Sequence, residues 1–337
     1  MLYGIGNPLM DIIVRASHES LELLGAVAGS MNLVDYERQQ EAVAAGAVVR
    51  RLPGGSCANT VRGVRWLLEA TGSASRRLYY TGAVGRDRTG DAFETLLDTE
   101  GVVPLLARKH TPTGSSVILV TPDSQRTMFT YLGACRDLDT SDVDLQRIRA
   151  AKVFHTTGYM WDTRSQEAAA RSAASAARAG RTIVSFDVAD PFVVQRSFDS
   201  LIGWIPGNVD VLFANEEELQ ALTRVRGPRE RVLRAAAAFA PTVAMKTGRR
   251  GCMVLHKGTM VTADAYPAER IDTTGAGDAF AAGYLYGLLS GMDAAACAAV
   301  ANIVAAAIVS VDGCNYDALE RGRISAAVEQ ALAAHSR

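Results

Sequence analysis

Two closely spaced glycines and an aspartate lie in the segment Asp272-Thr-Thr-Gly-Ala-Gly-Asp278, and a long apolar segment with helical composition follows it directly. A helix amino terminus presents unpaired N–H groups, and glycine allows a ligand to approach the backbone closely. The amides of Gly275, Ala276 and Gly277 can therefore hold a phosphoryl group. The carboxylate of Asp278 can then take a proton from a hydroxyl. The segment predicts phosphoryl transfer, although an isolated aspartate here is more often only a helix N-cap.

Other phosphate-binding patterns are incomplete or absent. Gly4-Ile-Gly6 supplies two of the three glycines of a dinucleotide fingerprint, and Leu9 occupies the place of the third. The sequence contains no G-x-x-x-x-G-K-[ST] string and no protein-kinase set. A P-loop enzyme and a protein kinase are therefore excluded.

The complete string from Asp272 to Phe280 resembles the signature of the ribokinase-type (PfkB) carbohydrate and nucleoside kinases, and the adenosine kinase branch is the most similar. The resemblance covers the chain from Gly4 to about Gly313. It implies ATP as donor, Mg²⁺ as cofactor and a nucleoside or sugar as acceptor. It also implies a monovalent cation such as K⁺ near Asp272 and Thr274. The enzyme is expected to be a monomer or a homodimer.

Two further segments match acceptor-binding elements of this family. Gly6-Asn7-Pro-Leu-Met-Asp11 ends the first predicted strand, where a carboxylate can accept hydrogen bonds from two neighbouring hydroxyls or merely cap a turn. Pro53-Gly-Gly-Ser-Cys-Ala-Asn59 lies at a predicted loop-to-helix junction and is alternatively a plain turn and cap. The resemblance implies contacts with the sugar hydroxyls of the acceptor. The residues concerned are Asn7, Asp11, Gly54, Gly55, Ser56 and Asn59.

Three other residues are weaker candidates for the acceptor side. Arg126 matches an arginine common in the adenosine kinase branch and can neutralise a transferring phosphate, but a solvated surface arginine is an equal alternative. Tyr159 and Trp161 follow a predicted strand and can stack on a base, although aromatic residues more often pack there.

Two segments are expected to bind the donor. Asn215-Glu-Glu-Glu218 is alternatively an ordinary acidic helix start, but the resemblance implies that Glu218 reaches Mg²⁺ through water. The loop that starts at Lys246 is alternatively a plain hairpin turn, but in the family it borders ATP, with the adenine between this loop and residues 301–315. The expected donor-site residues are Asn215, Glu218, Thr247, Gly248, Gly251, Thr274 and Asn302.

Strand-like and helix-like segments alternate along most of the chain, which predicts an α/β fold with a doubly covered, mostly parallel sheet. Ligands in such folds bind where the carboxyl ends of strands lead into helices. The predicted strands are 2–6, 78–82, 153–157, 183–187, 211–214 and 242–246, and the predicted helices are 58–69, 89–100, 164–179, 216–223 and 229–239.

Residues 12–34 and 113–131 interrupt this alternation. The second segment has two extended runs, 114–121 and 126–131, around a turn at 122–125. We assign both segments to a small β flap, or lid. The large domain then comprises residues 1–11, 35–112 and 132–337, in a ribokinase-like arrangement.

Composition excludes several other classes of protein. The net charge is −1 and charge runs are short, so neither nucleic acid nor an acidic membrane surface is an expected partner. The five cysteines are odd in number and form no C-x-x-C pair, which favours a reducing cytoplasmic location. No signal peptide and no membrane span are predicted.

The sequence thus predicts an ATP-dependent kinase for a hydroxyl of a ribose-containing molecule, with the 5′-hydroxyl of adenosine favoured. A sugar kinase acting on ribose, fructose or a keto-sugar acid is the alternative within the family. A non-catalytic nucleoside-binding protein is the alternative of another class, and the presence of Asp278 with both glycines argues against it. The acceptor, oligomeric state, cation dependence and regulation stay open.

Overall fold

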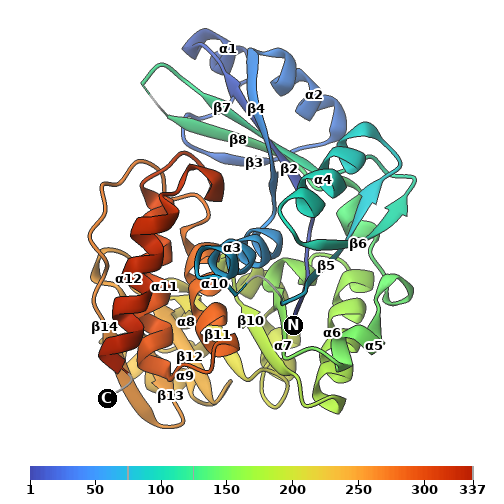
Figure 1. Ribbon diagram of the computed structural model, residues 1–337. Helices are drawn as coiled ribbons and strands as arrows, with labels where there is room; N and C mark the ends of the chain where they lie inside the picture. The colour runs from blue at the N-terminus through green and yellow to red at the C-terminus, as the bar shows by residue number, and fades with distance from the viewer. Residues whose placement is uncertain (74–75, 124, 336–337) are drawn as a thin grey trace.

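A computed structural model describes residues 1–73, 76–123 and 125–335 of the chain, arranged as two lobes (Figure 1). Within these residues the strands form one sheet of nine and one of five. The large sheet has the order β14-β13-β12-β11-β10-β9-β1-β5-β6, and its strands from β12 to β6 are parallel. The strands are β1 (Leu2–Ile5), β5 (Leu78–Gly85), β6 (Val103–Lys109), β9 (Val153–Thr157), β10 (Ile183–Asp187), β11 (Val211–Asn215), β12 (Thr242–Lys246), β13 (Cys252–His256) and β14 (Thr259–Ala263).

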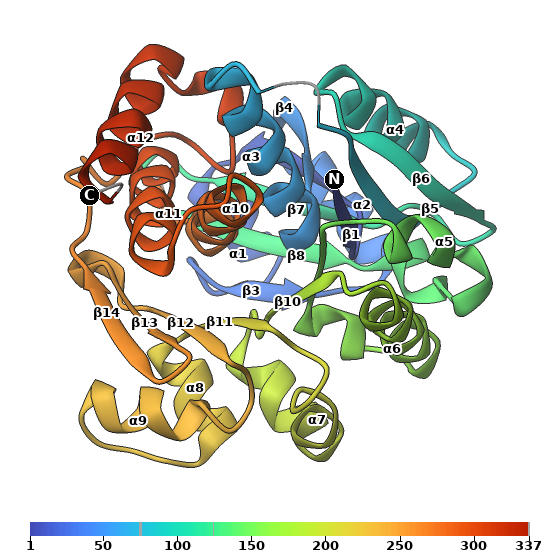
Figure 2. The same cartoon turned by 60° about the horizontal axis from the view of Figure 1, so that its bottom comes forward.

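Helices cover both faces of the large sheet, and each helix layer has its own buried apolar cluster (Figure 2). One layer contains α3 (Ser56–Ala70), α10 (Ala276–Leu289), α11 (Ala294–Val309) and α12 (Arg321–His335). The opposite layer contains α6 (Arg164–Ala179), α7 (Pro191–Trp204), α8 (Glu216–Thr223) and α9 (Arg229–Ala236). Helices α10 and α11 are apolar on all sides because neighbouring elements bury them almost completely. The prediction of a doubly covered, mostly parallel sheet is confirmed.

The small sheet has the order β3-β8-β7-β2-β4 and forms the upper lobe in Figure 1. Strands β7 and β8 form the expected hairpin. Ser124, in the turn between them, lies outside the described residues. Strand β4 and helix α2 also belong to this lobe, although the sequence analysis assigned them to the large domain. Most of β4 is solvent-exposed and lacks apolar alternation, so its pattern gave no strand signal. The bounds are β2 (Leu9–Arg15), β3 (Met31–Leu33), β4 (Ala47–Gly54), β7 (Ser115–Val120), β8 (Arg126–Tyr131), α1 (His18–Leu23) and α2 (Tyr36–Ala44).

The remaining helical elements are two α-helices and several 3₁₀ turns. The α-helices are α4 (Arg88–Thr99) and α5 (Leu145–Arg149). The 3₁₀ turns are η1 (Gly133–Asp137), η2 (Thr140–Asp142), η3 (Gly158–Trp161), η4 (Gly248–Arg250) and η5 (Tyr316–Ala318).

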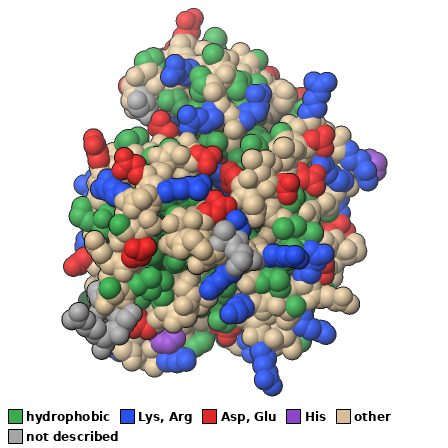
Figure 3. Space-filling view, in the orientation of Figure 1, with side chains coloured by type: hydrophobic (Ala, Val, Ile, Leu, Met, Phe, Trp, Pro, Cys, Tyr) green, Lys and Arg blue, Asp and Glu red, His purple; other side chains and the backbone are tan. Residues whose placement is uncertain are grey.

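The surface carries charges of both signs. Figure 3 shows acidic and basic side chains interspersed over one face, without a large patch of either sign. Among the helices in the described part of the chain, none has the length and apolarity needed to cross a bilayer.

Candidate active site

A cavity of about 850 Å³ lies at the carboxyl ends of the parallel strands and under the small sheet. Its walls include residues at or just after the ends of β1, β9, β10, β11 and β12, the first turns of α3 and α10, and side chains of β3, β7 and β8. Open α/β sheets place their ligands at this edge. The expected site residues that line the cavity are Asn7, Asp11, Gly55, Ser56, Asn59, Tyr159, Asn215, Glu218, Gly248, Thr274, Gly275, Gly277 and Asp278.

Asp278 lies in the first turn of α10, which begins at Ala276. Its Oδ1 accepts a hydrogen bond from Ser56 Oγ at 2.6 Å, and its Oδ2 accepts one from Asn59 Nδ2 at 2.9 Å. Burial raises the pKa of Asp278 to about 6, although these two hydrogen bonds oppose the rise. The carboxylate is therefore ionised at neutral pH, yet it is more basic than an exposed aspartate.

The hydrogen bonds of Ser56 and Asn59 differ from the expected contacts with an acceptor. The amide nitrogen of Asn59 is bound to Asp278, and its Oδ1 accepts a hydrogen bond from Arg62 Nη1 at 3.2 Å. The two side chains thus orient the carboxylate of Asp278. Sequence reasoning missed this link because the two segments are more than 200 residues apart.

The two glycines before Asp278 have different functions. Gly275 has a φ of +76°, and a Cβ added to it would lie 2.6 Å from Cys314 Cβ, so the turn itself requires glycine. A Cβ on Gly277 would meet only the flexible side chain of Lys246, with Nζ at 3.3 Å. Gly277 therefore keeps the amides at the start of α10 open to the cavity.

Gly54 and Gly55 allow Asp11 and Asn7 to approach the backbone. A Cβ on Gly54 would lie 2.4–2.5 Å from the carboxylate atoms of Asp11. Gly55 has a φ of +91°, and a Cβ there would lie 2.0 Å from the carbonyl oxygen of Asn7. Burial raises the pKa of Asp11 to about 7, with Arg62 lowering it and Asp278 raising it further. Asp11 and Asp278 are therefore both cavity-lining carboxylates with a raised pKa.

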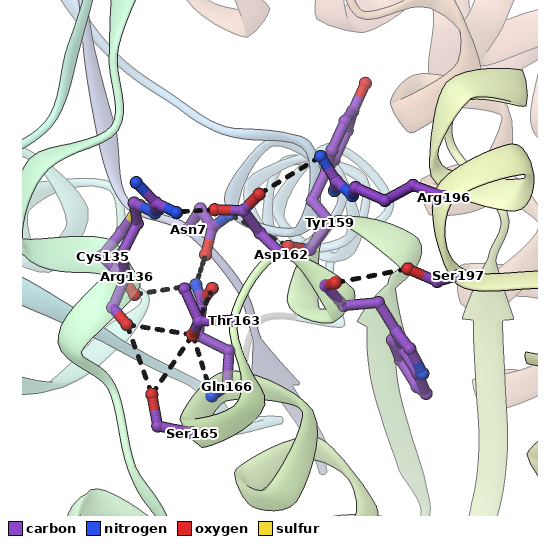
Figure 4. Close-up of polar contacts among 11 residues, drawn as sticks. Asn7, Cys135, Arg136, Tyr159, Asp162, Thr163, Ser165, Gln166, Arg196 and Ser197 are labelled. Carbon is purple, nitrogen blue, oxygen red and sulfur yellow. Dashed lines mark hydrogen bonds and ion pairs between the residues drawn. The ribbon is translucent and has the colours of Figure 1, made fainter. Parts of the chain in front are cut away.

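Asn7 is fixed by a residue that sequence reasoning missed. Gln166, buried in the first turn of α6, donates a hydrogen bond to Asn7 Oδ1 at 2.7 Å, and Asn7 Nδ2 donates one to the Tyr159 carbonyl at 3.4 Å. Figure 4 shows this contact beside Asp162, which lies between the guanidinium groups of Arg136 and Arg196. This end of the cavity is consequently polar.

The two aromatic candidates after β9 lie in different environments. Tyr159 lines the cavity. Trp161 is buried in the core instead, where it packs against Phe186 and Trp204 and donates its indole N–H to Ser200. Its packing against α7 and β10 leaves Trp161 no access to a ligand.

Asn215 and Glu218 form a reciprocal helix cap. Glu218 Oε2 accepts a hydrogen bond from the Asn215 backbone N–H at 2.8 Å, and Asn215 Oδ1 accepts one from the Glu218 N–H. Glu218 is nonetheless part of the cavity wall. Burial raises its pKa to about 7, while Lys246 lowers it.

The sequence analysis also missed an ion pair between Lys246 and Asp187. Lys246 Nζ lies 3.0 and 2.9 Å from the two carboxylate oxygens of Asp187, and both side chains line the cavity. Each residue ends an apolar parallel strand, and this position is the signal that could have identified the pair.

The remaining donor-side candidates lie around η4 and α11. Thr247 Oγ1 donates a hydrogen bond to the Gly251 carbonyl at 2.9 Å and closes the η4 turn, whose Gly248 faces the cavity. Asn302 is placed elsewhere, because its amide donates hydrogen bonds to the carbonyls of Ala263 and Asp264 and joins α11 to the end of β14.

Arg126 links the small sheet to the segment before Asp278. Its Nη1 lies 2.6 Å from Asp272 Oδ2, and its Nη2 lies 2.7 Å from Asp312 Oδ1. Asp272 Oδ1 also accepts hydrogen bonds from the N–H and the hydroxyl of Thr274, and its Oδ2 accepts one from the Gly313 N–H. A cation at Asp272 and Thr274 would share this carboxylate with Arg126.

Comparison with known proteins gives a consistent result along the whole chain. Residues 19–321 match the pfkB family of carbohydrate kinases. The chain is 32% identical to an adenosine kinase from Sinorhizobium meliloti (TM-score 0.85) and 30% identical to a protein described as a probable sugar kinase from Rhizobium etli CFN 42 (TM-score 0.86), with 98% of each chain covered in both cases. Adenosine kinase 1 of Arabidopsis thaliana is 24% identical over 341 residues, which cover 94% of this chain and 96% of the relative.

Proposed function

Because the chain belongs to the pfkB family of carbohydrate kinases, and is thus an ATP-dependent phosphotransferase with a hydroxyl as acceptor, we propose that it phosphorylates the 5′-hydroxyl of adenosine. The observation that carries the proposal is the position of Asp278, a half-buried carboxylate at an open, glycine-lined helix start, in the same cavity as Asp11.

The catalytic step follows from this arrangement. The acceptor oxygen attacks the γ-phosphorus of ATP, a new O–P bond forms, and the bond to the β–γ bridging oxygen breaks as ADP leaves. The hydroxyl proton passes to the Asp278 carboxylate, which Ser56 and Asn59 orient. The amides from Gly275 to Gly277 stabilise the charge on the migrating group. In this way the chain supplies both the base and the anion site.

Mg²⁺ fits the carboxylates of this cavity. Glu218 is a carboxylate in the cavity wall, and Mg²⁺ in proteins usually keeps several waters and needs only one or two carboxylates besides phosphate oxygens. We assign Glu218 to its water shell, where the ion would neutralise phosphate charge. A Glu218→Gln variant should need more Mg²⁺ for half-maximal rate, and an unchanged titration curve would leave Glu218 as a helix cap only. The monovalent cation at Asp272 and Thr274 stays a prediction.

The two substrates are proposed to occupy different parts of the site. Asp11 would accept hydrogen bonds from the ribose diol, with Asn7 and Tyr159 beside it. The adenine of ATP would lie between Gly248 and α11. A cytosolic location agrees with the five cysteines, which are free and buried among the described residues. Whether the enzyme is a monomer or a homodimer stays a prediction.

An acceptor screen tests the proposal. ADP release and product mass should be measured with adenosine, inosine, ribose and fructose as acceptors. Adenosine should give the highest kcat/KM, and its product should be the 5′-monophosphate. The similarity to the Rhizobium etli protein favours a sugar as the second candidate. Good turnover of ribose or fructose without turnover of adenosine would establish that second candidate and leave the phosphotransfer mechanism intact.

A further inference from the structure

We infer that Lys246 is a further catalytic residue, whose ammonium group contacts the migrating phosphoryl group while Asp187 holds it in position. The inference rests on the proposed function only in requiring that a phosphoryl group is transferred at the start of α10. It does not depend on which acceptor is used.

The order of the strands brings the two side chains together. Asp187 ends β10 and Lys246 ends β12, and β11 lies between them with Asn215 in register with Lys246. Lys246 Nζ contacts both Asp187 oxygens, and Asp187 Oδ1 also accepts a hydrogen bond from the Ala189 N–H at 3.0 Å. Asp187 therefore holds the ammonium group at the carboxyl-terminal edge of the large sheet, where the ligand cavity begins.

The ammonium group lies beside the glycines that are to bind the phosphoryl group. A Cβ on Gly277 would have Lys246 Nζ as its nearest neighbour, at 3.3 Å. An anion bound by the open amides of this turn would lie within reach of a charge-assisted hydrogen bond from Lys246. An ammonium group has three N–H donors, so the contact with Asp187 leaves at least one for such an anion.

The free energy that it costs to bury the ion pair of Lys246 and Asp187 also needs an explanation. The side chains of Lys246 and Asp187 are only 16% and 4% exposed. Buried ion pairs are often no more stabilising than apolar residues of the same volume, so stability alone does not account for the pair. Burial lowers the pKa of Lys246, but Asp187 and Glu218 raise it by more, so the side chain stays charged. The pair therefore keeps a charged ammonium group in the cavity wall, where it can donate a hydrogen bond to a phosphate oxygen.

Other basic side chains near the cavity have different partners. Arg196, which also lines it, pairs with Asp162 at the end near Asn7. Arg126 pairs with Asp272 and Asp312. Among the described residues of the cavity wall, Lys246 is the cation next to Gly277.

The test compares four variants. Lys246→Met removes the charge and keeps most of the side-chain volume, and Lys246→Arg keeps the charge. Asp187→Asn/Lys246→Met removes both buried charges, so its fold should survive. Lys109→Met is the matched control, because Lys109 also ends a strand and pairs with aspartates, but outside the cavity. For each variant we would measure kcat, KM, the melting temperature, and the Kd values of adenosine and of the non-hydrolysable ATP analogue AMP-PNP.

Lys246→Met should lower kcat by about 10²–10³, the loss typical when one donor to a transition-state anion is removed. Its Kd for AMP-PNP should rise about tenfold, the effect of losing one charged hydrogen bond, while the Kd for adenosine should stay within about threefold. The double variant should recover the melting temperature but not kcat, Lys246→Arg should recover part of kcat, and Lys109→Met should behave like the wild type.

Recovery of kcat in the double variant would show that the pair is only structural and would overturn the inference. Near-normal turnover of Lys246→Met would overturn it as well. If the wild type phosphorylated no acceptor, the proposed function would fail, and AMP-PNP binding would still decide the role of Lys246. Unchanged AMP-PNP affinity in Lys246→Met, or no affinity in the wild type, would then overturn the inference too.

Discussion

At the scale of single residues, the site depends on carboxylates whose basicity is set by burial. Asp278 and Asp11 lie in one cavity, and burial is the largest cause of the raised pKa of each. Hydrogen bonds from Ser56 and Asn59 keep the pKa of Asp278 from rising further. The structure thereby holds a base that is ionised at neutral pH and still able to take a proton.

The raised pKa of Asp278 predicts opposite effects of pH on activity and stability. A protonated carboxylate is no base, so kcat should fall as pH drops below about 6. The folded protein holds this proton more tightly than the unfolded chain, so the contribution of Asp278 to stability is full below about pH 4 and is lost as pH rises to about 6. Asp278→Asn should lower kcat by about 10²–10⁴ and still bind ATP.

Activity and thermal melting of wild type and Asp278→Asn between pH 4.5 and 8 check this prediction. The variant should gain melting temperature relative to the wild type as pH rises, because it lacks the buried charge. Near wild-type turnover of a folded Asp278→Asn protein would remove Asp278 from the mechanism.

Asp11 should decide between ribose and deoxyribose nucleosides. A site built to pair a hydroxyl rejects an analogue without it, because the buried carboxylate then lacks a donor. Adenosine should exceed 2′-deoxyadenosine and 3′-deoxyadenosine by about 10²-fold or more in kcat/KM. Asp11→Ala should lower activity on adenosine and reduce the ratio of its kcat/KM to that of each deoxyadenosine. If both kcat/KM ratios were unchanged in this variant, Asp11 would not contact the diol.

At the scale of elements, the amino terminus of α10 needs glycine at two positions, at one for the backbone turn and at the other for access of the ligand. The positive φ of Gly275 belongs to the turn before the helix, whereas Gly277 lies inside the first helical turn and faces the cavity. The same residue type therefore serves backbone geometry at one position and ligand access at the other.

Gly275→Ala and Gly277→Ala should separate these functions. Alanine at 275 would strain the turn and collide with Cys314, so this variant should lose stability. Alanine at 277 should leave stability unchanged or raise it by about 0.5–1 kcal/mol, since alanine is the better helix former. Its methyl group would nevertheless obstruct the anion site, so kcat/KM for ATP should fall. Denaturant unfolding and steady-state kinetics check both variants, and normal kinetics of Gly277→Ala would contradict the anion site.

At the scale of the whole molecule, the cavity lies between two lobes that Arg126 connects. Strand β8 of the small sheet carries Arg126, and its partners Asp272 and Asp312 belong to the large domain. Asp272 lies six residues before Asp278, so the position of the small sheet is tied directly to the segment that is proposed to bind phosphate.

Arg126→Met should loosen this connection. Hydrogen exchange should become faster in β8 and around residue 272, because a buried Asp272 oxygen loses its ion partner. Arg38→Met is the control, since Arg38 pairs with Glu41 within the small lobe at the solvent-exposed surface. Equal exchange in both variants would show that Arg126 does not hold the lobes together.

Local signals in the sequence were enough to predict the positions of several strands and the type of reaction. Apolar runs rich in strand-forming residues placed the strands 153–157, 183–187 and 242–246, because such runs report burial within a single element. The spacing of Gly275, Gly277 and Asp278 indicated phosphoryl transfer, because a helix start and its amides are also local features.

Tertiary structure alone decided which distant side chains meet. The bonds from Ser56 and Asn59 to Asp278, and the pair of Asp187 with Lys246, depend on strand order and helix packing, which no local pattern encodes. Trp161 resembled a possible stacking residue in sequence and is part of the core because β10 and α7 enclose it. Contacts of this kind arise from the burial of surfaces far apart along the chain, and for that reason the sequence pattern could not predict them.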